Sequence, residues 1–463
     1  MVVRNGTYFD RRLLPFIGYQ PVFEVSGDAE RKKYGLPPKQ ELPPPDDAEA
    51  RRYWSSVRDG DRIRVETIVG TAPDQIAVVP GMLRRTWTEN GRRYFHYGSR
   101  QPETFAGSVF SAKYAVEKGR WNDVALEVFH HPPHSATLDR MIAAMKGSLD
   151  YYTTEFGPYP YRELRVVEIP PYSIHGRAFP SAVAFAEQNF ITRTGEGLVD
   201  LTFFGTAHEI AHQWWGGQVR PAYAQGRAFV SEALSNYSAM LVTERVLGEA
   251  EARKVYDYQM DRYLRRRSET GEDAPLLLVE SHPHVSYGKG AVALYTLRER
   301  IGDEPMKVAL RRFLAKFGGS GPPYATSLDL YGELRAVTPP ELHYLLTDLF
   351  ETMTLWDVKT ERAAARRLPD GTYEVTLDVV AKKVRADATG IETPVAMNDS
   401  IEVGVFGAGD GDSLYLARHP VRSGKQTIHI VVPREPSRAG LDPDRKLIER
   451  ERGDNVVEIE SGG

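Results

Sequence analysis

The spacing of hydrophobic residues changes along the chain and predicts four zones. Up to about residue 133, short runs with alternating hydrophobic and polar positions are separated by proline-rich stretches such as Leu36–Asp47. Alternation with a period of two is typical of half-buried strands. We therefore expect a β-rich N-terminal domain over residues 1–133, with strands near Arg62–Val69, Gln75–Val79 and Val124–Phe129.

Between residues 134 and 303 the period becomes helical. Leu138, Met141, Met145 and Leu149 recur at the spacing of one helix face, and Gly157-Pro158 would end that helix. A buried strand is expected at Leu164–Ile169. Four further helices are then predicted, at Thr202–Trp215, Ala228–Leu247, Ala250–Arg267 and Val285–Ile301. This zone is predicted to be a mainly helical domain.

The last two zones differ again. Residues 304–355 continue the helical pattern, with a break at Thr338-Pro339-Pro340, and form a predicted helical extension. Residues 356–463 return to alternation, and short strands bounded by Gly, Asp and Pro at this spacing predict a C-terminal β-sandwich. Its expected strands are Tyr373–Val379, Ser400–Phe406, Ser413–Arg418 and Gln426–Val432. The fold class is therefore α+β, with several domains.

Composition narrows the function. The 463 residues are 41% hydrophobic and 26% charged, which is ordinary for a globular protein. A net charge of −4 gives no general attraction to phosphate backbones, so we expect no nucleic-acid partner. The absence of cysteine excludes disulfides, thiolate metal sites and a cysteine nucleophile. No run approaches the roughly 18 apolar residues of a membrane helix, and residues 1–10 lack a signal-peptide core, so the sequence as written predicts a soluble chain and leaves its compartment open.

One short motif carries chemistry, His208-Glu209-Ile210-Ala211-His212. Residues four apart lie on one helix face, so both imidazoles can reach one metal ion. The composition predicts only about 0.04 chance matches to this pattern. The plain alternative is a pair of structural histidines on a buried helix.

A catalytic zinc needs a third protein ligand and an open position for water. The metzincin pattern is excluded because Trp215 and Gln218 stand where it requires Gly and His. The candidate is instead Glu232, which lies in an apolar helical frame where an unpaired carboxylate is costly. With His208, His212 and Glu232 on one Zn²⁺ per chain, Glu209 would face the bound water as general base, and a separate group is needed for the oxyanion.

These residues resemble the zinc helix of the gluzincin aminopeptidases, the group of aminopeptidase N and leukotriene hydrolase. The resemblance runs from His208 to Gly216, although the spacer between His212 and Glu232 is one residue longer than usual. It implies a thermolysin-like catalytic domain over 134–303, preceded by part of a saddle-like β domain. It also assigns the oxyanion role to Tyr287, in a segment similar to the family's Tyr-x-Lys-Gly. The plain alternative is a tyrosine that packs at a helix start.

The resemblance is weaker where the family binds the free amine of its substrate. The family's Gly-x-Met-Glu-Asn motif is not intact within Ala182–Ile191, and Glu187 is its surviving candidate for the amine anchor. Gln101 is the candidate for a second anchor. The expected function is a zinc metallopeptidase that releases N-terminal residues from peptides. The open alternatives are a zinc endopeptidase with an open cleft and a non-catalytic peptide-binding module.

The chain also resembles a branch of the family in which the peptidase is fused to an ABC-transporter permease segment. Asn5-Gly6-Thr7, Gly18-Tyr19, and Glu187 with Phe190-Ile191 carry this likeness, which implies a link to a membrane transporter.

Other candidate residues are less specific. A histidine cluster at His130–His134 favours an exposed loop over a metal site, Trp214 and Trp215 favour the core, and Asn236 could orient a ligand. His282 and His284 are predicted to line the cleft.

Overall fold

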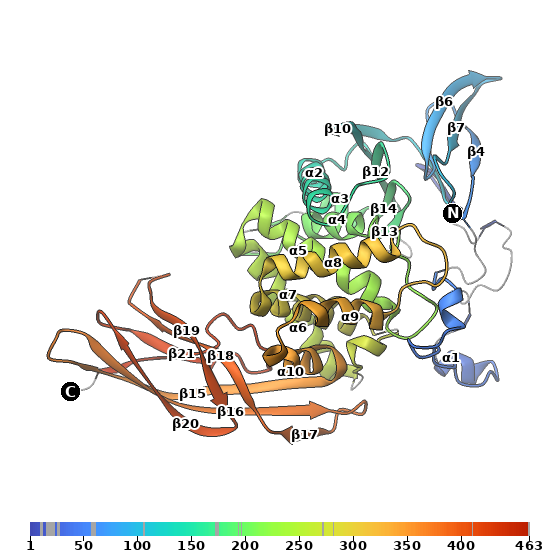
Figure 1. Cartoon of the computed structure of the whole chain (residues 1–463). Coiled ribbons are helices and arrows are strands. Elements are labelled where there is room, and N and C mark those ends of the chain that lie inside the picture. The colour runs from blue at the N-terminus through green and yellow to red at the C-terminus, as the bar shows by residue number, and fades with distance from the viewer. Residues whose placement is uncertain are drawn as a thin grey trace. The chain divides into compact units, whose positions relative to one another are not determined.

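The computed structural model describes residues 1–9, 13–14, 24–25, 28–56, 62–104, 107–171, 176–192, 194–195, 197–270, 273–280, 282–409 and 411–461. It divides into two compact units, the first comprising residues 1–262 and 276–343 and the second 263–275 and 344–463 (Figure 1). Gly18-Tyr19, part of the transporter likeness, lies outside the described residues. The division of the chain into four domains, expected from the sequence, remains a prediction.

The N-terminal part of the first unit is built from short antiparallel strands. A four-stranded sheet has the order β1-β2-β9-β5, a three-stranded sheet has the order β4-β7-β6, and β3 pairs with β8. The bounds are β1 Val2–Val3, β2 Gly6–Phe9, β3 Arg62–Ile63, β4 Glu66–Thr71, β5 Ile76–Val78, β6 Met82–Glu89, β7 Arg92–Gly98, β8 Glu103–Thr104 and β9 Val109–Ala112. The helical segments here are α1 Asp28–Lys33 and η3 Ala50–Arg52.

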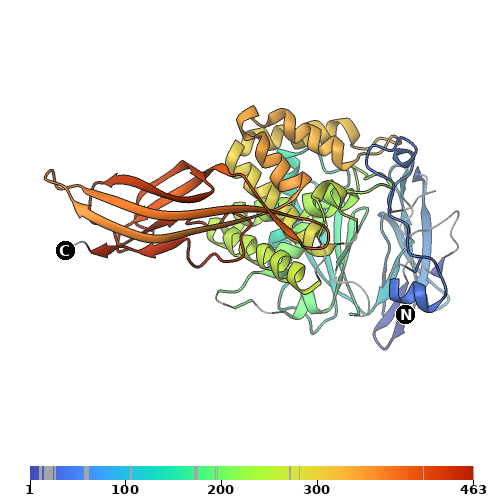
Figure 2. The ribbon, with the colours of Figure 1, turned by 90° about the horizontal axis from the view of Figure 1, so that it is seen from below.

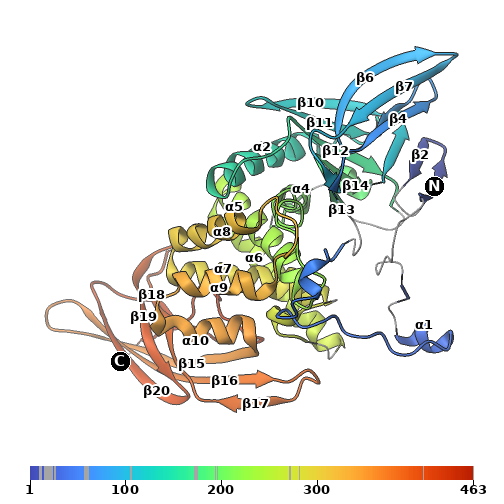
Figure 3. The same ribbon diagram turned by 45° about the vertical axis from the view of Figure 1, so that its right-hand side comes forward.

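A mixed five-stranded sheet follows, with the order β10-β11-β12-β14-β13 (Figure 3). Its strands are β10 Ala115–Trp121, β11 Val124–His130, β12 Glu163–Ile169, β13 Gly176–Phe179 and β14 Ala182–Ala186. Strands β11, β12 and β14 are parallel, and β13 is an antiparallel edge strand. Every residue of β12 is buried, as predicted for Leu164–Ile169, and these include the charged residues Glu163, Arg165 and Glu168. The predicted boundary at residue 133 falls inside the sequence span of this sheet.

Helices make up the rest of the first unit, and the helical residues 263–270 and 344–351 belong to the second unit. α2 packs against β10 and β11 on one side and against α4 on the other. Predicted helices appear at all five places, although α4 ends at Ala211 rather than Trp215. Two of them begin with a π-helical turn, η4 before α5 and η6 before α7. The bounds are α2 Leu138–Glu155, α3 Gln188–Ile191, α4 Leu201–Ala211, η4 Phe229–Ala233, α5 Leu234–Leu247, α6 Glu249–Thr270, η5 Leu276–Leu278, η6 His284–Lys289, α7 Gly290–Ile301, α8 Asp303–Phe317, α9 Ser327–Val337, η7 Pro340–Leu342, α10 His343–Leu346 and η8 Thr347–Glu351.

The second unit contains two mainly antiparallel sheets (Figure 2), with one parallel pair between β15 and β23. The sheets contact each other through β15, β21 and β22. One has the order β17-β16-β15-β23, with β20 also paired to β16, and the other has the order β19-β18-β21-β22. The bounds are β15 Met353–Arg367, β16 Tyr373–Ala386, β17 Glu392–Val395, β18 Asn398–Phe406, β19 Ser413–Arg422, β20 Gly424–Val432, β21 Arg438–Leu441, β22 Val456–Glu458 and β23 Glu460–Ser461. All four predicted strands are present, and the long strand β15 is an addition.

The predicted fold class is confirmed, with strands at both ends of the sequence and helices between them. Among the described residues, no helix combines the length and the apolar character needed to cross a membrane.

A buried charge cluster joins the sheets of the second unit. The ammonium of Lys383 lies 2.8 Å from a carboxylate oxygen of Asp348 and 3.0 Å from one of Asp399. The indole of Trp356 donates to Asp399 at 2.7 Å. Lys383 is 5% exposed, so its removal would leave two carboxylates inside the unit with less compensation.

We expect Lys383→Met to lower the free energy of unfolding by about 3–5 kcal/mol, because breaking a buried ion pair strands the remaining charge. Lys425→Met, which removes an exposed pair with Glu361, should cost less than about 1 kcal/mol. Urea titration followed by circular dichroism compares the two variants. Equal losses would show that the buried cluster does not stabilise this unit.

Candidate metal centre

Two imidazoles and one carboxylate converge at the end of α4. Nε2 of His208 and Nε2 of His212 are 3.1 Å apart, and a carboxylate oxygen of Glu232 lies 3.5 Å from the first and 3.3 Å from the second. Ligands at about 2.0–2.1 Å around a tetrahedral metal ion are separated by about 3.3–3.4 Å. The three donor atoms therefore have the spacing of one face of a tetrahedral site, and their types suit zinc.

The charges of these groups are coupled. Burial by itself would raise the pKa of Glu232, but the imidazoles of His212 and His208 hold it well below its usual range. Burial would lower the pKa of His212, whereas the carboxylate of Glu232 raises it to about 9. The carboxylate thus favours a positive charge beside it, which either a protonated histidine or a bound metal cation can supply.

Hydrogen bonds orient the ligands from behind. Nδ1 of His212 lies 2.9 Å from the carbonyl oxygen of Trp215 and 3.1 Å from the hydroxyl of Ser235, so its Nε2 is left to face the cluster. Among the described residues, Nδ1 of His208 has no such partner. Asn236 donates to the carbonyl oxygen of Tyr287 at 2.8 Å. It therefore holds the η6 turn, rather than a ligand side chain as the sequence suggested.

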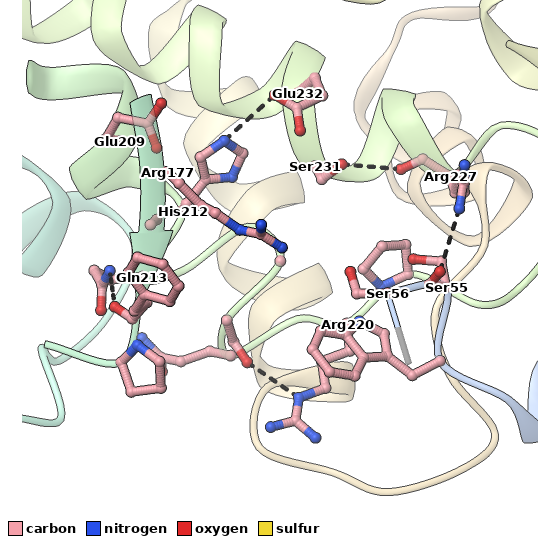
Figure 4. A pocket seen from close by; sticks show the side chains of 18 of the residues that line it. Ser55, Ser56, Arg177, Glu209, His212, Gln213, Arg220, Arg227, Ser231 and Glu232 are labelled. Atoms are coloured by element: carbon pink, nitrogen blue, oxygen red, sulfur yellow. Dashed lines mark hydrogen bonds and ion pairs between the residues drawn. The ribbon is translucent and has the colours of Figure 1, made fainter. Parts of the chain in front are cut away.

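Glu209 lies in the same pocket, on the side of β13 (Figure 4). It is 8% exposed, and burial raises its pKa, against the effect of the two histidines and Arg177. A Cβ at Gly176 would approach the carboxylate of Glu209 to 2.5 Å. Only glycine at this edge-strand position leaves room for the side chain of Glu209.

Tyr287 approaches the cluster from η6. The centroid of its ring is 5.7 Å from the centroid of the His208 ring. The guanidinium of Arg262 lies 4.9 Å from the centroid of the Tyr287 ring. Burial raises the pKa of Tyr287, and the neighbouring carboxylate of Glu232 raises it further. The phenol is therefore protonated near neutral pH and can donate a hydrogen bond.

Glu209, His212, Glu232 and Tyr287 line one pocket of about 760 Å³, whereas His208 is not among its lining residues. Gln101 and His282, both candidates from the sequence, also line it, whereas His284 does not. Trp214 and Trp215 are fully buried core residues, as predicted.

Glu187 lies elsewhere. It is not among the residues that line the pocket, and it is grouped instead with His134 and Glu168. Nδ1 of His134 and a carboxylate oxygen of Glu168 are only 2.6 Å apart, a direct hydrogen bond that leaves no space for a metal ion between these two atoms. The amine-anchor role predicted for Glu187 therefore has no geometric support at this pocket.

Several charged residues of the pocket were not predicted from the sequence, namely Arg62, Glu103, Arg177, Arg220, Arg227 and Glu280. Most come from loops and strand ends, where no periodic pattern marks them. The sequence offers one signal, for Arg177 alone: the pair Gly176-Arg177 stands shortly before the segment Ala182–Ile191, where the amine anchor was predicted.

Comparison with known proteins finds a similarity over the part of the chain that holds this site. Residues 138–338 match the peptidase family M1 domain. A protein named "Probable aminopeptidase 1" from Sulfurisphaera tokodaii is 24% identical over 211 residues, which are 43% of this chain and 26% of the relative. Aminopeptidase M1-B from Oryza sativa subsp. japonica is 24% identical over 233 residues, 45% of this chain and 24% of the relative. The matches thus span about a quarter of these relatives.

A solved structure shows the same fold over a longer range. Legionella pneumophila aminopeptidase A, in complex with aspartic acid, superposes with a TM-score of 0.55 and 14% sequence identity. The superposition covers 86% of this chain and 46% of that protein. At this identity the likeness concerns the fold alone.

The buried carboxyl of Glu103 gives a pH prediction. Burial, with the nearby charge of Glu163, raises its pKa to about 7, so the folded chain keeps a proton that the unfolded chain loses near pH 4.5. The free energy of unfolding is therefore unaffected by this group below the pKa of the unfolded chain, and it decreases as the pH rises through the pKa of the folded chain. We expect Glu103→Gln to gain on the order of 2 kcal/mol relative to wild type between pH 5 and pH 8. Melting temperatures of both proteins at the two pH values test this, and an unchanged difference would contradict it.

Proposed function

Because the chain carries a peptidase family M1 domain, we propose that it is a zinc-dependent peptidase that acts at the pocket around His208, His212 and Glu232. The observation that supports this most is the spacing of 3.1–3.5 Å among the three donor atoms, with Glu209 in the same pocket. When bound, Zn²⁺ lowers the pKa of its water to about 7 and polarises the substrate carbonyl.

The chain's own residues supply the proton transfers. Glu209 takes a proton from the attacking water and gives it to the leaving amine. Its burial supports this role, because a raised pKa brings a carboxylate closer to the operating pH. Tyr287, protonated and beside His208, donates a hydrogen bond to the oxyanion of the tetrahedral intermediate.

The finer proposal is an aminopeptidase, which removes residues from the N-terminus of a peptide. The names of the relatives support it, and so does Gln101 in the pocket, whereas Glu187 lies outside the lining. An endopeptidase with an open cleft is the second candidate, because the pocket lacks the predicted acidic anchor. A non-catalytic peptide-binding module and the link to a membrane transporter stay predictions from the sequence.

Metal content tests the ligand set. We expect Glu232→Gln to lose zinc on dialysis, since a neutral amide is a poor ligand, whereas wild type keeps one equivalent. Glu187→Gln is the matched control, because Glu187 belongs to the other His/Glu cluster and its loss should leave zinc bound. Elemental analysis measures both variants, and zinc retained by Glu232→Gln would remove this residue from the site.

Catalytic roles are tested at constant zinc content. Glu209→Gln should lower kcat by about 10²–10⁴, because it removes the general base. Tyr287→Phe should lower it by about 10²–10³, the loss typical of one oxyanion donor. Both variants should bind zinc normally. Full activity of Glu209→Gln would refute the proposed mechanism.

The mode of cleavage is tested by mass spectrometry with one peptide set that has either free or acetylated N-termini. Stepwise loss of N-terminal residues from the free peptides alone is the expected result. Internal cuts in both sets would instead establish an endopeptidase. Glu209→Gln serves as the blank, and no cleavage beyond it by zinc-loaded wild type would favour the binding module.

A further inference from the structure

Outside the catalytic cluster, the charged side chains that line the pocket are mainly arginines. Four arginines line it, and two of its four lining carboxylates, Glu209 and Glu232, belong to the catalytic cluster. Outside that cluster, four arginines are accompanied by only two carboxylates. The other two carboxylates are Glu103, whose pKa near 7 makes it partly neutral, and Glu280. Such a pocket attracts anionic groups of a ligand.

Two of the arginines are paired with neutral groups. Nε of Arg220 donates to the carbonyl oxygen of Gly217 at 3.4 Å, and its guanidinium lies 4.8 Å from the ring centroid of Trp54. Nη1 of Arg227 donates to the carbonyl oxygen of Ser55 at 3.2 Å. Within the part of the chain that the structure describes, neither arginine has a carboxylate within ion-pair distance.

This arrangement is costly without a ligand. Arg220 is 6% exposed, and burial lowers its pKa to about 10. Burial also lowers the pKa of Arg227, against the more distant charges of Glu280 and Glu232. The carboxylate of Glu280 accepts a hydrogen bond from the backbone N–H of Leu42. Arg220 acts on the carboxyl of Glu103 only at longer range, without an ion pair. A buried cation without a close counter-ion is expensive, so an anion that approaches Arg220 recovers part of that cost.

The two arginines are placed along the path from the catalytic cluster. Arg227 precedes Glu232 on the same helical segment, where the hydroxyl of Ser231 donates to the carbonyl oxygen of Arg227 at 3.3 Å. Arg220 lies in the loop that follows α4 and Gly217. Figure 4 shows both on the side of the pocket away from Glu209. A peptide bound at the cluster that extends away from Glu209 would therefore meet them.

We propose that the pocket selects peptides that carry a carboxylate, which Arg220 and Arg227 bind beyond the scissile bond. This inference rests on the proposed peptidase function and adds its substrate class. Guanidinium groups match the two oxygens of a carboxylate in geometry as well as charge. In a peptide the carboxylate is either an Asp or Glu side chain or the C-terminus, and both sources offer the same chemistry.

Binding is measured by calorimetry on zinc-loaded Glu209→Gln, so that the peptide is not consumed. The probes are alanine tetrapeptides in two arms. One arm compares a C-terminal carboxylate with a carboxamide, and the other places Asp or Asn at each position of a C-terminal amide. We expect at least one arm to show binding about tenfold or more tighter for the carboxylate, the effect of a charge-assisted hydrogen bond in a buried site.

Adding Arg220→Gln or Arg227→Gln should abolish that preference. Arg92→Gln, which removes an exposed arginine that also donates to a backbone carbonyl, should leave it intact. Arg220→Lys and Arg227→Lys keep the charge without the planar fork, and circular dichroism with zinc content checks that each variant folds.

Equal binding of acid and neutral peptides in both arms would overturn the inference, as would a preference that survives in both glutamine variants. Cleavage by wild type, measured separately, distinguishes the two levels of the argument. Efficient cleavage without a carboxylate preference would leave the peptidase and remove its specificity, whereas carboxylate-dependent binding without cleavage would do the reverse.

Discussion

The site depends on the electrostatic attraction between one buried carboxylate and two imidazoles. A carboxylate oxygen of Glu232 lies 3.3–3.5 Å from Nε2 of the two histidines. Burial of either charge without the other would be energetically costly. Their convergence favours a cation between them. In the proposed mechanism, that cation would activate the water from which Glu209 takes a proton and polarise the carbonyl whose oxyanion Tyr287 stabilises.

Local distortion places these groups. Glu232 and Tyr287 both lie in π-helical turns, η4 and η6, which re-aim side chains at the start of α5 and α7. The two turns approach closely, since a Cβ at Gly290 would come within 2.5 Å of Cβ of Ala233. On the opposite side, Gly176 lets the edge strand β13 lie against Glu209. Backbone packing thus fixes the pocket before any ligand binds.

Much of this could be predicted from local patterns. Helical periodicity located α2 and α4, because burial of one helix face leaves a direct trace in the sequence. The strand β12 was located as well, although Arg165 and Glu168 interrupt its apolar residues. The two-histidine motif is local as well. Strand β15 was missed because its second half is rich in Ala, Arg and Glu, which favour helix, whereas pairing along β16 holds it extended.

The pocket residues that could not be predicted from the sequence are those brought together by tertiary structure. The predicted amine anchor Glu187 follows the end of β14, and sheet register, not sequence, determines that Gly176 and Arg177 of β13 line the pocket instead. Arg220 and Arg227 reach it from a loop and a helix start, so their convergence depends on how the chain returns from α4 to η4. No periodic signal records that path.

The central claim is that His208, His212 and Glu232 hold one zinc ion. X-ray absorption spectroscopy of the zinc-loaded chain tests it most directly. The account predicts two imidazole nitrogens and oxygen ligands at about 2.0–2.1 Å, with one imidazole lost in His212→Ala. A spectrum with any other number of imidazoles, or one unchanged by that substitution, would contradict it.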